Sequence, residues 1–239
     1  DRAAIGKRIA ELRQALPPEI SLHYAIKANP MPAVVAHIAP LVDGLDLASA
    51  GELAVALDIG ANPAHISFAG PGKTDSELHR AAAAGICVNV ESEREIRVLA
   101  AYSRARGIRP RVAIRVNPDF ELKTSGMKMG GGPKQFGIDA ERVPQVLRDL
   151  AGLPLDFVGF HIYGGSQNLR ADAIAEAEHK ALELAIALSA DAPAPVQLLN
   201  IGGGFGIPYF PGQPPLAPYI TIWRHLATLV RWYAKTIRC

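Results

Sequence analysis

The stretch YAIKANP, from Tyr24 to Pro30, decides how the rest of the sequence is interpreted. Apolar residues alternate over positions 22–26 as they do in a β-strand, and Pro30 ends the pattern. The pattern therefore predicts that Lys27 lies at the end of a buried strand. A desolvated lysine amine has a lowered pKa and reacts with carbonyl carbons, so Lys27 is a candidate Schiff-base lysine. The alternative is a lysine whose charged end reaches solvent from the strand end.

The composition describes an ordinary globular protein with one substantial core, since 49% of the 239 residues are hydrophobic and 20% are charged. A net charge of +2 gives no reason to expect a nucleic-acid partner. Two cysteines are too few for a disulfide framework or a thiolate metal site, which favours a reducing compartment, and we predict no metal site. No apolar run reaches membrane-spanning length and no signal peptide opens the chain, so we expect a cytoplasmic protein without a membrane partner.

Strand and helix patterns alternate along the chain on both sides of Lys27. After a leading helix over 3–16, strands are expected at 22–26, 41–48, 66–69, 86–90, 112–116, 157–162 and 196–201. Helices are expected at 49–60, 74–85, 92–107, 139–150 and 171–189. The first three of these begin with capping boxes, Ser49 with Glu52, Thr74 with Glu77 and Ser92 with Glu95.

This alternation predicts an α/β fold of parallel strands with helical crossovers, either a doubly wound open sheet or a (β/α)8 TIM-type barrel. Seven evenly short units favour the barrel, and no eighth strand is visible. We expect one domain over residues 1–239, with a leading helix and linker at 1–21, barrel units at 22–215 and an atypical apolar tail at 216–239. The glycine-rich stretch 121–134 is either a lid or binding loop, or simply disordered.

In such a barrel the active site lies at the carboxyl ends of the strands. The polar or glycine-rich positions there are Lys27, Asp46, 68–73, Glu91, Arg115, Asn117, 161–167 and 202–206. The three consecutive glycines of NIGGGFG, residues 200–206, can present backbone amides to a phosphate, although a tight turn without a ligand is the alternative. By itself, a histidine at a strand end such as His161 is more often a hydrogen-bonded structural residue than a catalytic one, and Ser166 also fits the role of a turn residue. A reactive lysine beside a phosphate site nevertheless indicates a cofactor with an aldehyde and a phosphate, which is pyridoxal phosphate.

Six stretches together resemble the fold-type III pyridoxal-phosphate decarboxylases, the group of diaminopimelate, ornithine and arginine decarboxylases with an alanine-racemase-like barrel. They are YAIKAN (24–29), GLDLASAGEL (44–53), RVNP (115–118), QFGI (135–138), GFHIYGGSQ (159–167) and GGGFG (202–206). Each is weak alone, but the set follows the family's order and is highly specific.

The resemblance implies decarboxylation of an amino acid, either diaminopimelate- or ornithine-like or bound to a carrier protein, through a Lys27 Schiff base. It implies that the phosphate is held by Ser166, Gly202, Gly203 and Gly204, and that the cofactor pocket is lined by Asp46, Arg115, His161 and Tyr163. It also implies a homodimer whose active sites are completed across the interface.

The sequence departs from the family pattern in three ways. Tyr163 stands where the family usually has a ring-stacking histidine; its flat face can still stack, and the change hints at the subgroup linked to exosortase-type or carrier-protein pathways. The family's opening β-strand is missing before Asp1. The EPGR-type motif and the C-terminal β-domain are also missing, so we expect an incomplete barrel. The open alternatives are a pyridoxal-phosphate-binding barrel without activity and a racemase on the same fold.

Overall fold

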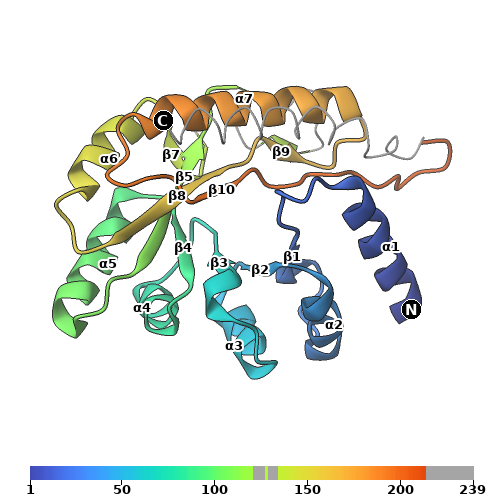
Figure 1. Ribbon diagram of the computed structural model, residues 1–239, viewed down its shortest axis with the longest axis horizontal. Helices are drawn as coiled ribbons and strands as arrows, with labels where there is room; N and C mark the ends of the chain where they lie inside the picture. Colours follow the sequence, from blue (N-terminus) through green and yellow to red (C-terminus); the bar gives the residue numbers. More distant parts are fainter. Residues whose placement is uncertain (121–126, 129–133, 214–239) are drawn as a thin grey trace.

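The computed structural model describes residues 1–120, 127–128 and 134–213, and its main feature is a parallel sheet (Figure 1). The strands run in the order β1-β2-β3-β4-β5-β8-β10, and β7 pairs with β5 beside β8. Their bounds are β1 His23–Ala25, β2 Gly44–Leu47, β3 Ile66–Phe68, β4 Cys87–Val90, β5 Arg111–Asn117, β7 Ile138–Asp139, β8 Asp156–Ile162 and β10 Leu198–Asn200. Two short strands, β6 Met127–Lys128 and β9 Gly165–Ser166, form a separate antiparallel pair.

Helices follow the strands as crossovers. The α-helices are α1 Arg2–Ala15, α2 Pro32–Ile38, α3 Ala50–Asp58, α4 Asp75–Ala84, α5 Glu93–Arg106, α6 Val143–Leu150 and α7 Ala171–Ser189. Three-residue 3-10 helices are η1 Ile26–Ala28, η2 Ala39–Leu41 and η3 Pro63–His65. Figure 1 shows these helices around the outside of the curved sheet, with α2 to α5 below it and α7 above it in this view, and residues of α3, α4, α5 and α7 pack into one core with the sheet. The described residues therefore form an incomplete (β/α)8 barrel, which confirms the expected fold class.

The two faces of β5 explain how the fold positions polar side chains. Val112, Ile114 and Val116 are buried in the main core, which the helices cover. The intervening Ala113 belongs to a small cluster with Cys87, Val158 and Leu198. Because side chains alternate along a strand, Arg115 shares the face of Ala113. The inner face of the sheet is thus apolar at its base and polar at the carboxyl ends of the strands.

Most expected elements are confirmed, and four differ. The strand expected at 41–48 begins only at Gly44, and the helix expected at 139–150 begins at Val143 because residues 138–139 form β7. The short helix α2 was not predicted. The sheet strand that precedes Lys27 ends at Ala25, so Lys27 lies in η1 instead of in the strand.

Two expectations lie largely or wholly outside the described residues. These are the lid or binding loop at 121–134, of which only 127–128 and 134 are described, and the apolar tail at 216–239. The proposed domain boundaries stay a prediction. No helix in the described part of the chain has both the length and the hydropathy needed to cross a bilayer.

Candidate functional site

The carboxyl ends of the strands bring charged side chains from four parts of the chain to one edge of the sheet. His161 lies one residue before the end of β8, next to Arg115, its register partner on β5. The charges of Arg115, Asp46, Lys73 and Lys27 all act on the imidazole of His161. The strand-end residues named from the sequence therefore do converge in space.

His161 is buried in this cluster as a neutral ring. Burial first and then the charge of Arg115 lower the pKa of His161 to about 3, although Asp46 acts in the opposite direction. Its Nδ1 atom has no hydrogen-bond partner among the described residues. A buried ring nitrogen without a partner is a group that a bound ligand can satisfy.

Asp46 is held by a short chain of hydrogen bonds across neighbouring strands. Its Oδ1 lies 3.3 Å from His23 Nδ1 and accepts a hydrogen bond from Ser67 Oγ at 2.6 Å. Asn89 Nδ2 donates in turn to Ser67 Oγ at 3.2 Å. Burial raises the pKa of Asp46, but His23 and Ser67 outweigh it and the net pKa is lowered. Asp46 is therefore a fixed carboxylate at neutral pH.

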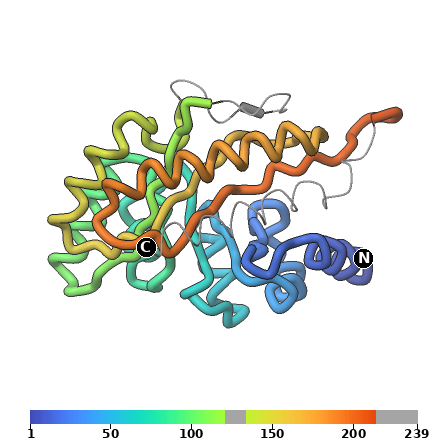
Figure 2. Tube along the Cα trace, turned by 45° about the horizontal axis from the view of Figure 1, so that its top comes forward, coloured from blue at the N-terminus to red at the C-terminus, as the bar shows by residue number. Residues whose placement is uncertain are grey.

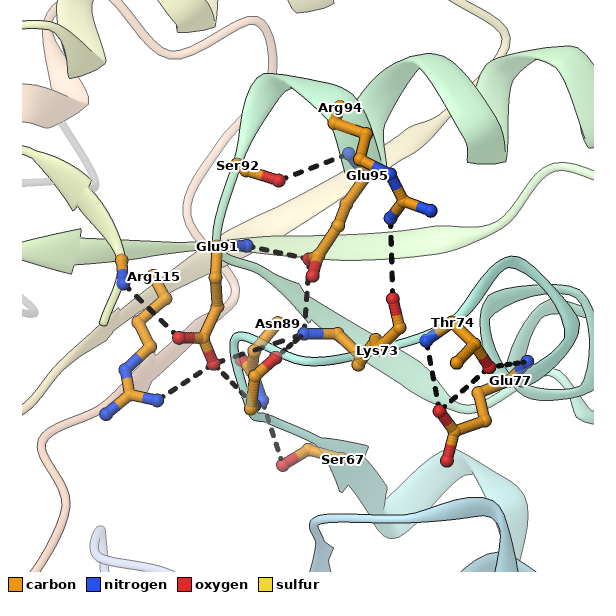
Figure 3. A network of polar contacts seen from close by, with 12 residues as sticks. Ser67, Lys73, Thr74, Glu77, Asn89, Glu91, Ser92, Arg94, Glu95 and Arg115 are labelled. Atoms are coloured by element: carbon orange, nitrogen blue, oxygen red, sulfur yellow. Dashed lines mark hydrogen bonds and ion pairs between the residues drawn. The ribbon is translucent and has the colours of Figure 1, made fainter. Parts of the chain in front are cut away.

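A second network surrounds Glu91 at the end of β4 (Figure 3). Its carboxylate accepts hydrogen bonds from Arg115 Nη1 at 2.8 Å and from the backbone amides of Gly70 and Gly137. Lys73 Nζ lies 3.1 Å from Glu95 Oε2 and 4.0 Å from Glu91 Oε1. Two cations and two carboxylates, all buried, thus balance one another and fix the guanidinium of Arg115.

Burial and pairing oppose each other within this network. Burial lowers the pKa of Lys73, and the carboxylates of Glu95 and Glu91 counteract it. Burial likewise raises the pKa of Glu95 against the charge of Lys73. Such a cluster is costly to disturb one residue at a time, because any single removal leaves a buried charge without its partner.

The glycine run after β10 packs against the loop after β8, and we call residues Gly202–Gly204 the glycine cradle. Gly202 and Gly204 have φ values of 73° and 76°. A Cβ on Gly202 would lie 2.1 Å from the ring of Tyr163, and one on Gly204 would lie 2.2 Å from Gly165 O. Both the backbone conformation and the close approach therefore require glycine.

Tyr163 connects the glycine cradle with Ser166. Its ring lies against Gly202, and its hydroxyl is 2.7 Å from Ser166 Oγ. Among the described residues, the amides of Gly203 and Gly204 have no hydrogen-bond acceptor. Two free amides and a serine hydroxyl at one place are groups that can bind an anion.

Lys27 differs from the sequence-based expectation. It lies in η1, and its side chain is exposed instead of buried. The argument that burial desolvates its amine is therefore wrong for this structure. Its charge still acts on His161, and it directly follows the carboxyl end of β1, at the end of the sheet that carries the other site residues.

Sequence reasoning missed several residues of the site. Glu95 was interpreted only as a helix-capping residue, and His23 was not considered. Glu178 on α7 is buried, with both carboxylate oxygens lacking partners in the described part of the chain. Its signal was present in the sequence, because Glu178 stands in the apolar helical register of Ile174, Ala181 and Ala185.

Comparison with known proteins gives consistent matches over almost the whole chain. The family model described as pyridoxal-dependent decarboxylase, pyridoxal binding domain, matches residues 2–237. The sequence is 37% identical over 217 residues to the diaminopimelate decarboxylase of Aquifex aeolicus, covering 90% of this chain and 51% of that protein. It is 36% identical over 212 residues to a Niallia circulans decarboxylase named for an L-glutamyl-BtrI acyl-carrier protein, covering 86% of this chain and 49% of that protein.

A solved structure agrees with these matches. The diaminopimelate decarboxylase of Helicobacter pylori, complexed with L-lysine, superimposes with a TM-score of 0.86 at 27% sequence identity. The superposition covers 97% of this chain and 59% of that structure. The chain spans about half the length of the curated relatives it matches.

Proposed function

The chain belongs to the family of pyridoxal-dependent decarboxylases, and from that premise we propose that it is the cofactor-binding part of an amino-acid decarboxylase. Pyridoxal phosphate is the cofactor of this family. The observation that carries the proposal is that Lys27, Asp46, Arg115 and His161 converge at the carboxyl ends of the strands. The glycine cradle follows β10 at the same end of the sheet.

The residues present fit a phosphorylated cofactor. In the glycine cradle, two backbone amides have no acceptor among the described residues, a side chain cannot fit at Gly202 or Gly204, and Ser166 is joined to the cradle through Tyr163. We assign phosphate binding to Ser166, Gly202, Gly203 and Gly204. The unsatisfied Nδ1 of His161 is a second group that the described residues leave for a ligand.

The remaining residues take roles that follow from their environment. Lys27, exposed and close to the site, supplies the amine that binds the cofactor's aldehyde carbon. His161 offers a neutral ring, and Arg115 is held in place by Glu91. Asp46 supplies a fixed negative charge, and Tyr163 supplies a flat face in the pocket. When bound, pyridoxal phosphate provides the electron sink that accepts the electron pair left as carbon dioxide departs.

Borohydride trapping tests the assignment of Lys27. We expect the chain with added pyridoxal phosphate to develop a visible absorption band, and borohydride to fix the cofactor on the peptide that contains Lys27. The variant Lys27→Ala should lack both the band and the modified peptide, whereas the exposed control Lys7→Ala should keep them. Equal labelling of the wild type and Lys27→Ala would show that Lys27 is an ordinary surface lysine.

The relatives indicate two substrate classes for the whole protein. One is named for diaminopimelate and the other for a glutamyl group on a carrier protein. We propose a substrate from one of these classes, with release of carbon dioxide from its α-carbon. An assay of the protein with each substrate separates them, and binding of the cofactor without release of carbon dioxide from either would favour a barrel that binds cofactor but lacks activity.

Two further properties, the compartment and the assembly, accompany this function. We infer a cytoplasmic enzyme. We also infer that it works as a homodimer, because the family resemblance implies active sites completed across a subunit interface. Sedimentation of the protein at several concentrations tests the assembly. A monomer that keeps full decarboxylase activity would contradict the shared-site arrangement.

A further inference from the structure

Helix α7 carries a buried carboxyl group that the site described so far does not use. Glu178 is 5% exposed, and neither of its oxygens has a partner among the described residues. Burial raises the pKa of Glu178 to about 8, so the carboxyl is mostly neutral at pH 7. A buried polar group without a partner is costly, and its position therefore needs a reason.

The position of Glu178 links it to the glycine cradle. Glu178 lines a cavity of about 20 Å³, which is room for about one water molecule. The same cavity is lined by Gly203 of the glycine cradle and by Tyr163, Gly164 and Gly165 after β8. Figure 2 shows α7 running alongside the chain segments that carry these residues. Glu178 and the backbone to which we assign phosphate binding therefore line one shared cavity.

No cation from the described residues lines this cavity. Besides Glu178, the only titratable lining residue is Tyr163, from the loop after β8, and burial raises the pKa of its hydroxyl. The residues that line it from α7 and from the run after β10 are otherwise apolar or glycine. The other charged groups of α7 pair elsewhere, His179 with Glu183 at 3.2 Å among them. An ionised Glu178 would thus be a buried negative charge without compensation.

We propose that Glu178 must carry its proton for a phosphate group to bind in the glycine cradle, so that this carboxyl couples cofactor affinity to pH. The proposal rests on the proposed function for the identity of the phosphate ligand. A neutral carboxyl can donate its proton within the cavity. An ionised one places a like charge next to the phosphate where little solvent screens it. Glu178 is accordingly a positioning residue, with no contact to the reacting atoms.

The test uses pyridoxine 5′-phosphate, which carries the phosphate but no aldehyde and so does not react with Lys27. Calorimetry on the full chain compares affinity at pH 7 and pH 9, both above the second ionisation of a phosphate monoester, which lies near pH 6. For a site that requires the protonated form of a group with a pKa of about 8, wild-type affinity falls about tenfold between these values. The side chain of Glu178→Gln is neutral at both pH values. After correction for any pH dependence shared by all variants, its affinity should therefore change less than about twofold.

Two controls make the comparison specific. Glu183→Gln removes an exposed carboxylate from the same helix and should follow the wild type. Pyridoxine without phosphate should bind equally to wild type and Glu178→Gln at both pH values. Circular dichroism checks folding at each pH, and Glu178→Leu replaces the glutamine variant if that variant does not fold.

The outcomes separate this inference from the proposed function. If wild type and Glu178→Gln lose affinity to the same extent between pH 7 and pH 9, the coupling through Glu178 is wrong while the cofactor site stands. If no variant binds pyridoxine 5′-phosphate at pH 7, the phosphate site itself is wrong, and the inference falls with it.

Discussion

The Glu91 carboxylate, a single buried group, joins the loop after β3, the strand β5 and the stretch before β7. Replacing it by glutamine leaves Lys73 and Arg115 with Glu95 as the remaining carboxylate of the network (Figure 3). Breaking a buried ion pair from one side typically costs about 3–5 kcal/mol. We therefore expect Glu91→Gln to lower the free energy of unfolding by about that amount in urea titrations.

The matched control for this prediction is Glu93, two residues further along. Glu93 forms an exposed ion pair with Arg142, and such pairs contribute less than about 1 kcal/mol. Glu93→Gln should therefore leave the unfolding midpoint almost unchanged. Similar losses in Glu91→Gln and Glu93→Gln would show that burial of the network does not determine its contribution.

Between elements, the Glu77 carboxylate connects the beginnings of two helices. It accepts hydrogen bonds from Thr74 N at the start of α4 and from Ala50 N at the start of α3, both at 3.0 Å. These backbone hydrogen bonds, that from Thr74 first, hold the pKa of Glu77 below its usual value. A lowered folded-state pKa means that the carboxylate stabilises the protein above pH 4.5 and that this contribution is lost as the pH falls through the folded-state value.

We expect Glu77→Ala to lower the free energy of unfolding at pH 7 by about 1–2 kcal/mol, as for loss of a helix cap. The difference from wild type should be smaller at pH 3 than at pH 7, because the stabilisation by the carboxylate is lost progressively as the pH falls through its lowered pKa. The exposed Glu141→Ala serves as the control. Denaturant titrations at both pH values measure the effect, and a loss at pH 3 equal to that at pH 7 would rule out the charged form as its source.

The helix starts also show where sequence patterns stop being informative. All three predicted capping serines and threonines accept the expected amide, but only Thr74 with Glu77 forms the reciprocal bond. Glu52 and Glu95 instead accept from the amides of Ala48 and Glu91, one residue before the cap. Residue spacing places a carboxylate near a helix start, but which amide it reaches depends on the preceding turn, which the pattern does not specify.

The same limit applies to the site as a whole. The strand ends were predictable, because alternation and glycine positions place Asp46, Arg115 and His161 at one edge of a parallel sheet. The exposure of Lys27 was not, since periodicity cannot show that the chain leaves the strand at Ile26. For Glu178 the apolar helical register indicates a core-facing position, but the register cannot show whether any partner reaches its carboxylate.

At the scale of the whole molecule, the proposed cofactor contacts follow the first and the last strand of the sheet order. Lys27 directly follows β1 and the glycine cradle follows β10, and these are the two end strands of the order β1-β2-β3-β4-β5-β8-β10 among the described residues. Both end strands are half-buried, whereas β4 is buried throughout. Without ligand, the backbone amides of β1 and β10 should therefore exchange hydrogen faster than those of β4 and β5.

A ligand bound through Lys27 at one end and through the glycine cradle at the other would tie these two strands together. At a free concentration 100 times its Kd, pyridoxal phosphate should stabilise the bound form by about 2.7 kcal/mol, which slows exchange of the affected amides by about 100-fold. We expect this protection in both β1 and β10, measured by hydrogen exchange with mass spectrometry. In Lys27→Ala, β10 should keep part of its protection while β1 loses most of it. Protection confined to β10 in the wild type would mean that the phosphate binds but the cofactor does not bridge the edges.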